Sequence, residues 1–182
     1  MRANDASVIG TVQAWLKDVV IGLGLCPFAK PEFDAGRVHY AVMRPVIVED
    51  CIAAVLSECA ALDKTPSRET SLVIIPEGLD DFQDYLDVIA AAEAELKSRE
   101  YEGIYQLASF HPDYVFEGAD VDDAANYTNR SPYPIIHILR EASVEAAVGG
   151  YDNPEKIPER NIALTRKMGA GAMRGLLAAC KR

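Results

Sequence analysis

The apolar residues change their spacing several times along the chain, and each spacing predicts one kind of element. Through residues 7–24 they recur at helical intervals, which predicts an amphipathic helix. Gly22 and Gly24 weaken the end of this helix, and Pro27 stops it. Residues 37–43 alternate instead and are rich in β-forming side chains, so this stretch is predicted to be a strand.

The remainder of the chain keeps alternating between the two spacings. Further helices are predicted at residues 45–62, 82–96, 143–148 and 158–179, and further strands at 72–75, 104–110 and 135–139. The run Leu72–Ile75 is wholly apolar, which indicates an interior strand covered on both faces. The predicted fold is a single-domain α/β or α+β sandwich, in which a mixed, roughly four-stranded sheet is packed with helices.

Length and composition favour one domain spanning residues 1–182. The chain is 49% hydrophobic and 25% charged, which is ordinary for a globular domain of this size. Its first residues resemble no signal peptide, and no stretch reaches about 18 uninterrupted apolar residues, as a membrane span would. These features predict a cytoplasmic protein that does not associate with a membrane.

The formal net charge of −10 narrows the classes of partner. Nucleic-acid binding needs positive charge that displaces counterions from phosphates, so no nucleic-acid partner is expected. Docking on an anionic membrane is disfavoured for the same reason. The charge is uneven, however, because the stretch from Lys156 to the end holds seven bases and one acid. A small anionic molecule can therefore still bind in a local basic pocket.

Residues 109–141 concentrate polar side chains on a backbone stiffened by Pro112, Pro132 and Pro134. A reactive site commonly needs a general acid or base, and a histidine imidazole titrates near neutral pH. The candidate catalytic residues are His111, His137, Asp113 and Glu141, with the carboxylates orienting an imidazole. If the strands at 104–110 and 135–139 are neighbours, the two imidazoles can lie near one another.

Candidate ligand-binding residues lie in the same segment and at two other places. They are Arg130, Asn129, Ser131, Arg160, Cys26 and Lys30. The planar guanidinium of Arg130 can hold a carboxylate or phosphate. Arg160 lies in the first turn of the last predicted helix, where free N–H groups favour anions. Cys26 follows the first helix, whose negative end disfavours a thiolate, and Lys30 can offset that effect.

Several of these residues also have a structural explanation. His137 is flanked by isoleucines, as a hydrogen-bonded core histidine would be. Arg130 can order the long connection at 111–134 by binding backbone carbonyls or nearby acids. Cys51 and Cys59 fall on a helical apolar stripe and are interpreted as core residues. A zinc knuckle is not expected, because the sequence contains no CxxC pair.

Four runs of the sequence resemble a known bacterial family. They are GLCPFAKP, SFHPDYVFEG, NYTNRSPYPIIHILRE and IPERNI, of which TNRSPYP is specific. Over nearly its whole length the chain resembles the family catalogued as domain of unknown function 1415. The resemblance implies one domain and carries no activity, substrate or catalytic residue.

Three functional hypotheses are compatible with these patterns. The leading one is an enzyme acting on a small anionic molecule, with His111 or His137 as general acid or base. Arg130 would clamp the substrate, together with Arg160. The alternatives are a non-catalytic ligand-binding or regulatory module that uses the same pocket, and a metal site built from His111, Asp113 and His137. The sequence indicates no particular cofactor and no oligomeric state.

Overall fold

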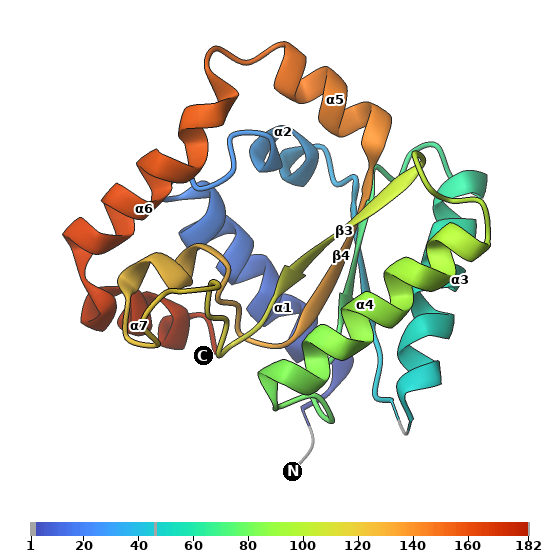
Figure 1. The fold of residues 1–182 in the computed structure, drawn as a ribbon, viewed down its shortest axis with the longest axis horizontal. Coiled ribbons are helices and arrows are strands. Elements are labelled where there is room, and N and C mark those ends of the chain that lie inside the picture. Colours follow the sequence, from blue (N-terminus) through green and yellow to red (C-terminus); the bar gives the residue numbers. More distant parts are fainter. Residues whose placement is uncertain (1–2, 46, 182) are drawn as a thin grey trace.

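The computed structural model describes residues 3–45 and 47–181, which form a four-stranded sheet with helices on both faces (Figure 1). The strands are β1 (Val38–Val42), β2 (Thr70–Ile74), β3 (Tyr105–Phe110) and β4 (Ile135–Arg140). Their order is β1-β2-β4-β3, with β1 parallel to β2 and β4 antiparallel to both of its neighbours. Every residue of β2 is buried, as expected for the interior strand. The mixed α/β fold predicted from the sequence is confirmed.

The helical elements mostly lie where the apolar pattern predicts them. In chain order they are α1 (Asp5–Trp15), the π-helix η1 (Leu16–Ile21), α2 (Ala29–Asp34), α3 (Val48–Lys64), α4 (Phe82–Ser98), the 3-10 helix η2 (Ala124–Thr128), α5 (Glu141–Gly149), the 3-10 helix η3 (Pro154–Lys156), α6 (Ile157–Met168) and α7 (Ala170–Ala179). The single helix expected at 158–179 is instead two helices that meet at Gly169. Its φ of 83° lies in the left-handed region, where an α-helix cannot continue.

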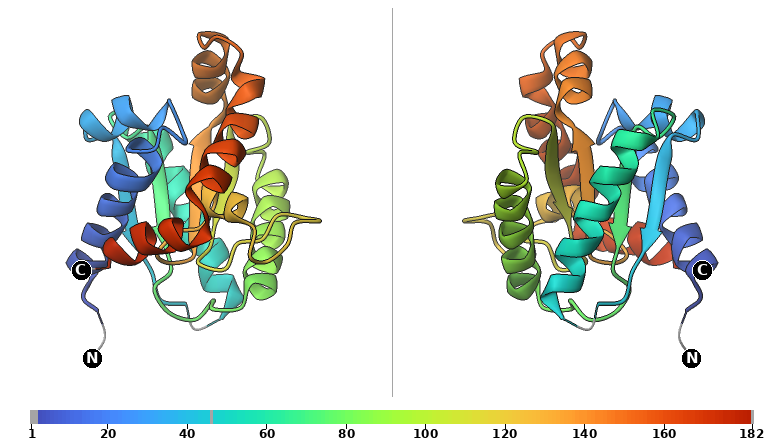
Figure 2. Two further views of the ribbon diagram at one scale, coloured as in Figure 1. Left: turned by 90° about the vertical axis from the view of Figure 1, so that its left-hand side faces the viewer. Right: turned by 90° about the vertical axis from the view of Figure 1, so that its right-hand side faces the viewer.

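Alternation along β4 divides the core into two layers. Ile136 and Ile138 pack with α3 and α4 on one face of the sheet. Ile135 packs on the other face with residues of α1, η1 and α7. The two views in Figure 2 show α3 and α4 covering one side, and α1, α6 and α7 on the other. Because successive strand side chains point to opposite faces, the position of a residue in β4 decides which layer it belongs to.

Tyr85 joins α4 to the end of the sheet where β3 finishes and β4 begins. Its side chain is fully buried, and its hydroxyl donates to the carbonyl oxygen of Ile135 at 2.7 Å. The same hydroxyl accepts the N–H of Phe110 at 3.0 Å. Burial raises the pKa of Tyr85, so the hydroxyl keeps the proton that this bridge requires. The bridge fixes the chain just before the 111–134 connection.

The first helix widens where α1 passes into η1. The N–H of Gly22 bonds the carbonyl oxygen of Lys17 at 3.0 Å, and the N–H of Leu25 bonds that of Val20 at 2.8 Å. Both bonds reach back five residues, as in a π-helix, a rare conformation that is frequent at functional sites. A Cβ atom on Gly22 would collide with the backbone carbonyl of Asp18. The wide turn therefore depends on glycine at this position.

Replacing Gly22 with alanine should destabilise the protein by about 1–3 kcal/mol, because the added methyl group forces a backbone carbonyl to move. The matched control is Gly10→Ala in α1, where a Cβ meets open space. Helix propensity alone should make that variant more stable by about 0.5–1 kcal/mol. Urea unfolding measures both changes. An equal gain in the two variants would show that the wide turn does not require Gly22.

Candidate functional site

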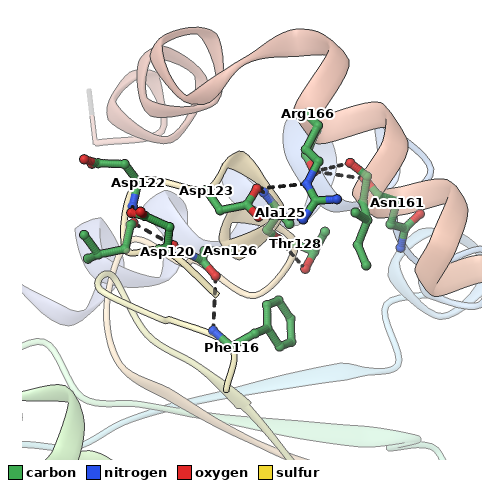
Figure 3. Close-up of polar contacts among 12 residues, drawn as sticks. Phe116, Asp120, Asp122, Asp123, Ala125, Asn126, Thr128, Asn161 and Arg166 are labelled. Atoms are coloured by element: carbon green, nitrogen blue, oxygen red, sulfur yellow. Dashed lines mark hydrogen bonds and ion pairs between the residues drawn. The ribbon is translucent and has the colours of Figure 1, made fainter. Parts of the chain in front are cut away.

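The 111–134 connection is ordered by hydrogen bonds within itself (Figure 3). Asn126 is fully buried, and its side chain donates to the carbonyl oxygen of Asp120 at 2.8 Å and accepts the N–H of Phe116 at 3.1 Å. Asp123 accepts the N–H of Ala125 and forms a two-point ion pair with Arg166 of α6. This guanidinium lowers the pKa of Asp123 to about 2. The acidic turn therefore supports the loop and connects it to α6.

His111 lies on the α4 face of the sheet and uses both ring nitrogens. Its side chain is fully buried against Phe82 and Tyr85, with ring centroids 5.2 and 5.1 Å away. Nε2 lies 3.0 Å from the carbonyl oxygen of Leu79, and Nδ1 accepts the N–H of Asp113 at 3.0 Å. A carbonyl oxygen only accepts, so Nε2 carries the proton. Burial lowers the pKa of His111, and the neutral ring holds the turn together.

His137 lies on the opposite face, so the sheet separates the two candidate histidines. Strands β3 and β4 are indeed neighbours, with Ala108 paired to His137. His137 nevertheless shares the face of Ile135 and Phe110, whereas His111 continues past the end of β3 toward α4. The expectation that the two imidazoles lie near one another is therefore wrong. Adjacency of strands does not bring together residues of opposite phase.

The hydrogen bonds of His137 fix which nitrogen carries its proton. Nε2 lies 2.7 Å from Oγ1 of Thr70, and the same oxygen lies 2.5 Å from the carbonyl oxygen of Ile138. The hydroxyl has one proton, which goes to the carbonyl, so Nε2–H must donate to Thr70. Nδ1 then carries a lone pair, and no described residue donates to it. Burial lowers the pKa of His137 to about 4, so the ring is neutral at pH 7.

The ring of His137 lines a cavity of about 340 Å³ between the sheet and the helices of the second layer. We call this the first cavity. All four strands contribute residues to its walls. The other walls come from the end of α1, from η1 and α2, and from the first two turns of α5. Most of the lining is apolar; the side chains that can form hydrogen bonds are Trp15, Cys26, Glu32, Glu69, Thr70, His137, Arg140 and Ser143. A small molecule with an apolar body and few polar groups fits such a lining.

Of the other sequence candidates, Cys26 alone shares this cavity with His137. Burial raises the pKa of Cys26 more than the nearby N–H groups of Phe28 and Ala29 lower it. The group is therefore a neutral thiol. Lys30, expected to offset the helix end beside the cysteine, forms an ion pair with Asp34 on the surface of α2.

The remaining candidates make contacts within the fold. Asn129 donates to the carbonyl oxygen of Ser109 at 3.2 Å, and buried Ser131 donates to that of Tyr133 at 2.5 Å. Arg160 binds the carbonyl oxygen of Gly24, and Glu141 begins α5 with its N–H on the carbonyl of Ile104. Across the described residues, no three His, Cys, Asp or Glu side chains are placed to hold one metal ion. His111, Asp113 and His137 thus form no shared centre.

The comparison with protein families matches residues 7–175 to the model described as "Protein of unknown function (DUF1415)". The chain belongs to this family. No curated protein and no solved structure matches it. In this DUF1415 protein, no helix in the described part of the chain is long and apolar enough to cross a membrane.

Arg130 of the DUF1415 protein binds the loop that carries it. Nε donates to the carbonyl oxygen of Tyr114 at 3.1 Å, and one terminal nitrogen donates to that of Val121 at 3.0 Å. The guanidinium carbon lies 4.7 Å from the ring centroid of Tyr127. Its own carbonyl oxygen accepts the indole N–H of Trp15 at 3.2 Å. Arg130 therefore orders the loop and supports a wall of the first cavity, without lining that cavity itself.

Arg130→Ala should destabilise the protein by about 1–3 kcal/mol, because partly buried loop carbonyls lose their donors. A suitable control is Arg99→Ala, which removes an exposed pair with Glu95 one helical turn away and should cost only about 0.5 kcal/mol. Thermal and urea unfolding report both changes. If Arg130→Ala unfolds like the wild type, the loop does not need this side chain, and a ligand-binding role becomes the better explanation of the residue.

Proposed function

We propose that this DUF1415 protein binds a small molecule with a largely apolar body in the first cavity, and that His137 acts on it as hydrogen-bond acceptor and general base. The observation that carries the proposal is the free Nδ1 lone pair of a neutral imidazole in a mostly apolar cavity. Because no described residue donates to Nδ1, a ligand that donates a hydrogen bond to it gains affinity. A pKa of about 4 keeps the ring neutral at pH 7, so Nδ1 is available to accept a hydrogen bond or a proton.

The proposed ligand carries a hydroxyl or amide N–H beside its apolar part. Arg140 is the basic side chain of the lining, and its guanidinium already donates to the carbonyl oxygens of Leu62 and Arg68. Glu32 and Glu69 also border the cavity, and their carboxylates disfavour a negatively charged ligand. An uncharged donor group therefore fits better than a phosphate held by an arginine clamp.

An anionic substrate is the second candidate, and one observation favours it. Ser143 and Val144, in the first turn of α5, line the first cavity. The first N–H groups of a helix lack partners within that helix and attract anions. A carboxylate beside α5 would then lie near Arg140. In either case the net charge of −10 supports a small molecule over nucleic acid as the ligand.

The chain contains a single tryptophan, and it lines the cavity, so its fluorescence reports binding directly. Titration with octanol should change the emission of Trp15 with a measurable Kd. His137→Leu should weaken octanol about three- to tenfold, the value of one hydrogen bond. Octanoate measured in parallel tests the anionic candidate, which requires octanoate to bind more tightly than octanol.

The control is His39→Leu, which removes the histidine of β1 that lies 3.6 Å from Glu58 and outside the first cavity. This variant should bind octanol as the wild type does. Equal weakening in both histidine variants, or an unchanged Kd in His137→Leu, would contradict the role of His137. Turnover of any ligand that binds then separates an enzyme from a binding module.

A further inference from the structure

A second cavity lies next to the first and shares three of its lining side chains. It has a volume of about 370 Å³ and lies between the end of η1, the 111–134 connection and the beginning of α6. Val20, Cys26 and Phe110 line both cavities. A residue can border two cavities only where the wall between them is one side chain thick. The three shared residues therefore mark a junction.

The second cavity offers a ligand apolar contacts and little else. Leu25, Phe116 and Ile162 are among its walls. Its two amide side chains are already engaged, because Asn161 donates to the carbonyl oxygen of Leu25 at 2.7 Å and Asn129 to that of Ser109 at 3.2 Å. Its walls thus match hydrocarbon, whereas His137 and the charged side chains of the pair of cavities line the first cavity.

We propose that the two cavities form one site for a molecule with a linear aliphatic chain, whose polar head lies at His137 and whose chain passes Cys26 and Phe110 into the second cavity. The proposal rests on the proposed function and specifies its ligand class. A flexible, unbranched chain fits two apolar spaces separated only by three side chains, whereas a bulky ring system does not. The neutral thiol of Cys26 is compact and compatible with hydrocarbon at the junction.

A series of alcohols from hexanol to tetradecanol, titrated by isothermal calorimetry, tests this dependence on chain length, because that readout is unaffected when a variant adds a second tryptophan. In the wild type each added methylene should lower the Kd about threefold to fourfold until the second cavity is filled. Ile162→Trp places a large side chain in the second cavity alone. That variant should bind hexanol normally and bind the longest alcohols at least tenfold more weakly.

The matched control is Ile104→Trp, which makes the same exchange at an exposed residue outside both cavities. It should reproduce the wild-type series. If the wild-type Kd stops falling at short alcohols and Ile162→Trp has no effect, the cavities are separate sites and the inference is overturned. Failure of even hexanol to bind would instead overturn the proposed function.

Alkylation of Cys26 provides a second readout, which uses the wild-type protein and needs no substitution. The other three cysteines are buried and Cys26 is half-buried, so N-ethylmaleimide should modify Cys26 first. Saturating dodecanol should slow this reaction at least tenfold, because its chain covers the thiol. Hexanol at equal occupancy should slow it less. Equal protection by both alcohols would place the chain entirely in the first cavity and contradict a shared site.

Discussion

Strand β4 lies between β2 and β3, and its alternation determines which face of the sheet each of its own residues occupies, His137 included. Ile136 and Ile138 face α3 and α4, while Ile135 and His137 face the second layer. Each strand pair therefore contributes to two chemically different environments. On one side α3 and α4 pack against the sheet in a largely apolar cluster. On the other, the helices of the second layer leave the first cavity above His137.

The imidazole ring of His137 lies in that cavity and keeps one hydrogen-bond partner there. Thr70 begins β2, and its hydroxyl connects Nε2 of His137 to a backbone carbonyl of β4. The arrangement holds the ring in one tautomer and directs its remaining lone pair away from the strand partner. In His111, by contrast, both ring nitrogens form hydrogen bonds, so neither is available to a ligand. The two histidines of this segment thus differ in which ring nitrogens have a hydrogen-bond partner.

The elements were predictable from the sequence because their periods are local properties. The four strands lie within about two residues of the expected positions, and the interior strand at Leu72–Ile75 was evident from its uniform apolarity. Gly169 breaks the last helix through its backbone angle, a signal that helical spacing alone does not carry. The short α2 has too few residues to display a period.

The site was less predictable, because it depends on strand order and phase across distant segments. Position 137 could be assigned to the face of residues 135 and 139, but nothing in the chain states that β4 inserts beside β2. The partner Thr70 therefore carried no signal, and neither did Trp15, which resembled any core residue of a helical stripe. Arg130 was predicted to bind a ligand, whereas its guanidinium binds loop carbonyls 16 and 9 residues away.

The hydrogen bonds of His137 make it a neutral imidazole with its proton on Nε2 and a lone pair on Nδ1. Long-range proton–nitrogen NMR of the three histidines measures this directly, with the His137 signals assigned by their loss in His137→Leu. This tautomer predicts the Nε2–H pattern at pH 7, a titration midpoint at about 4, and a change in the Nδ1 chemical shift on addition of an alcohol. A midpoint near 6.5, or a proton on Nδ1, would contradict it.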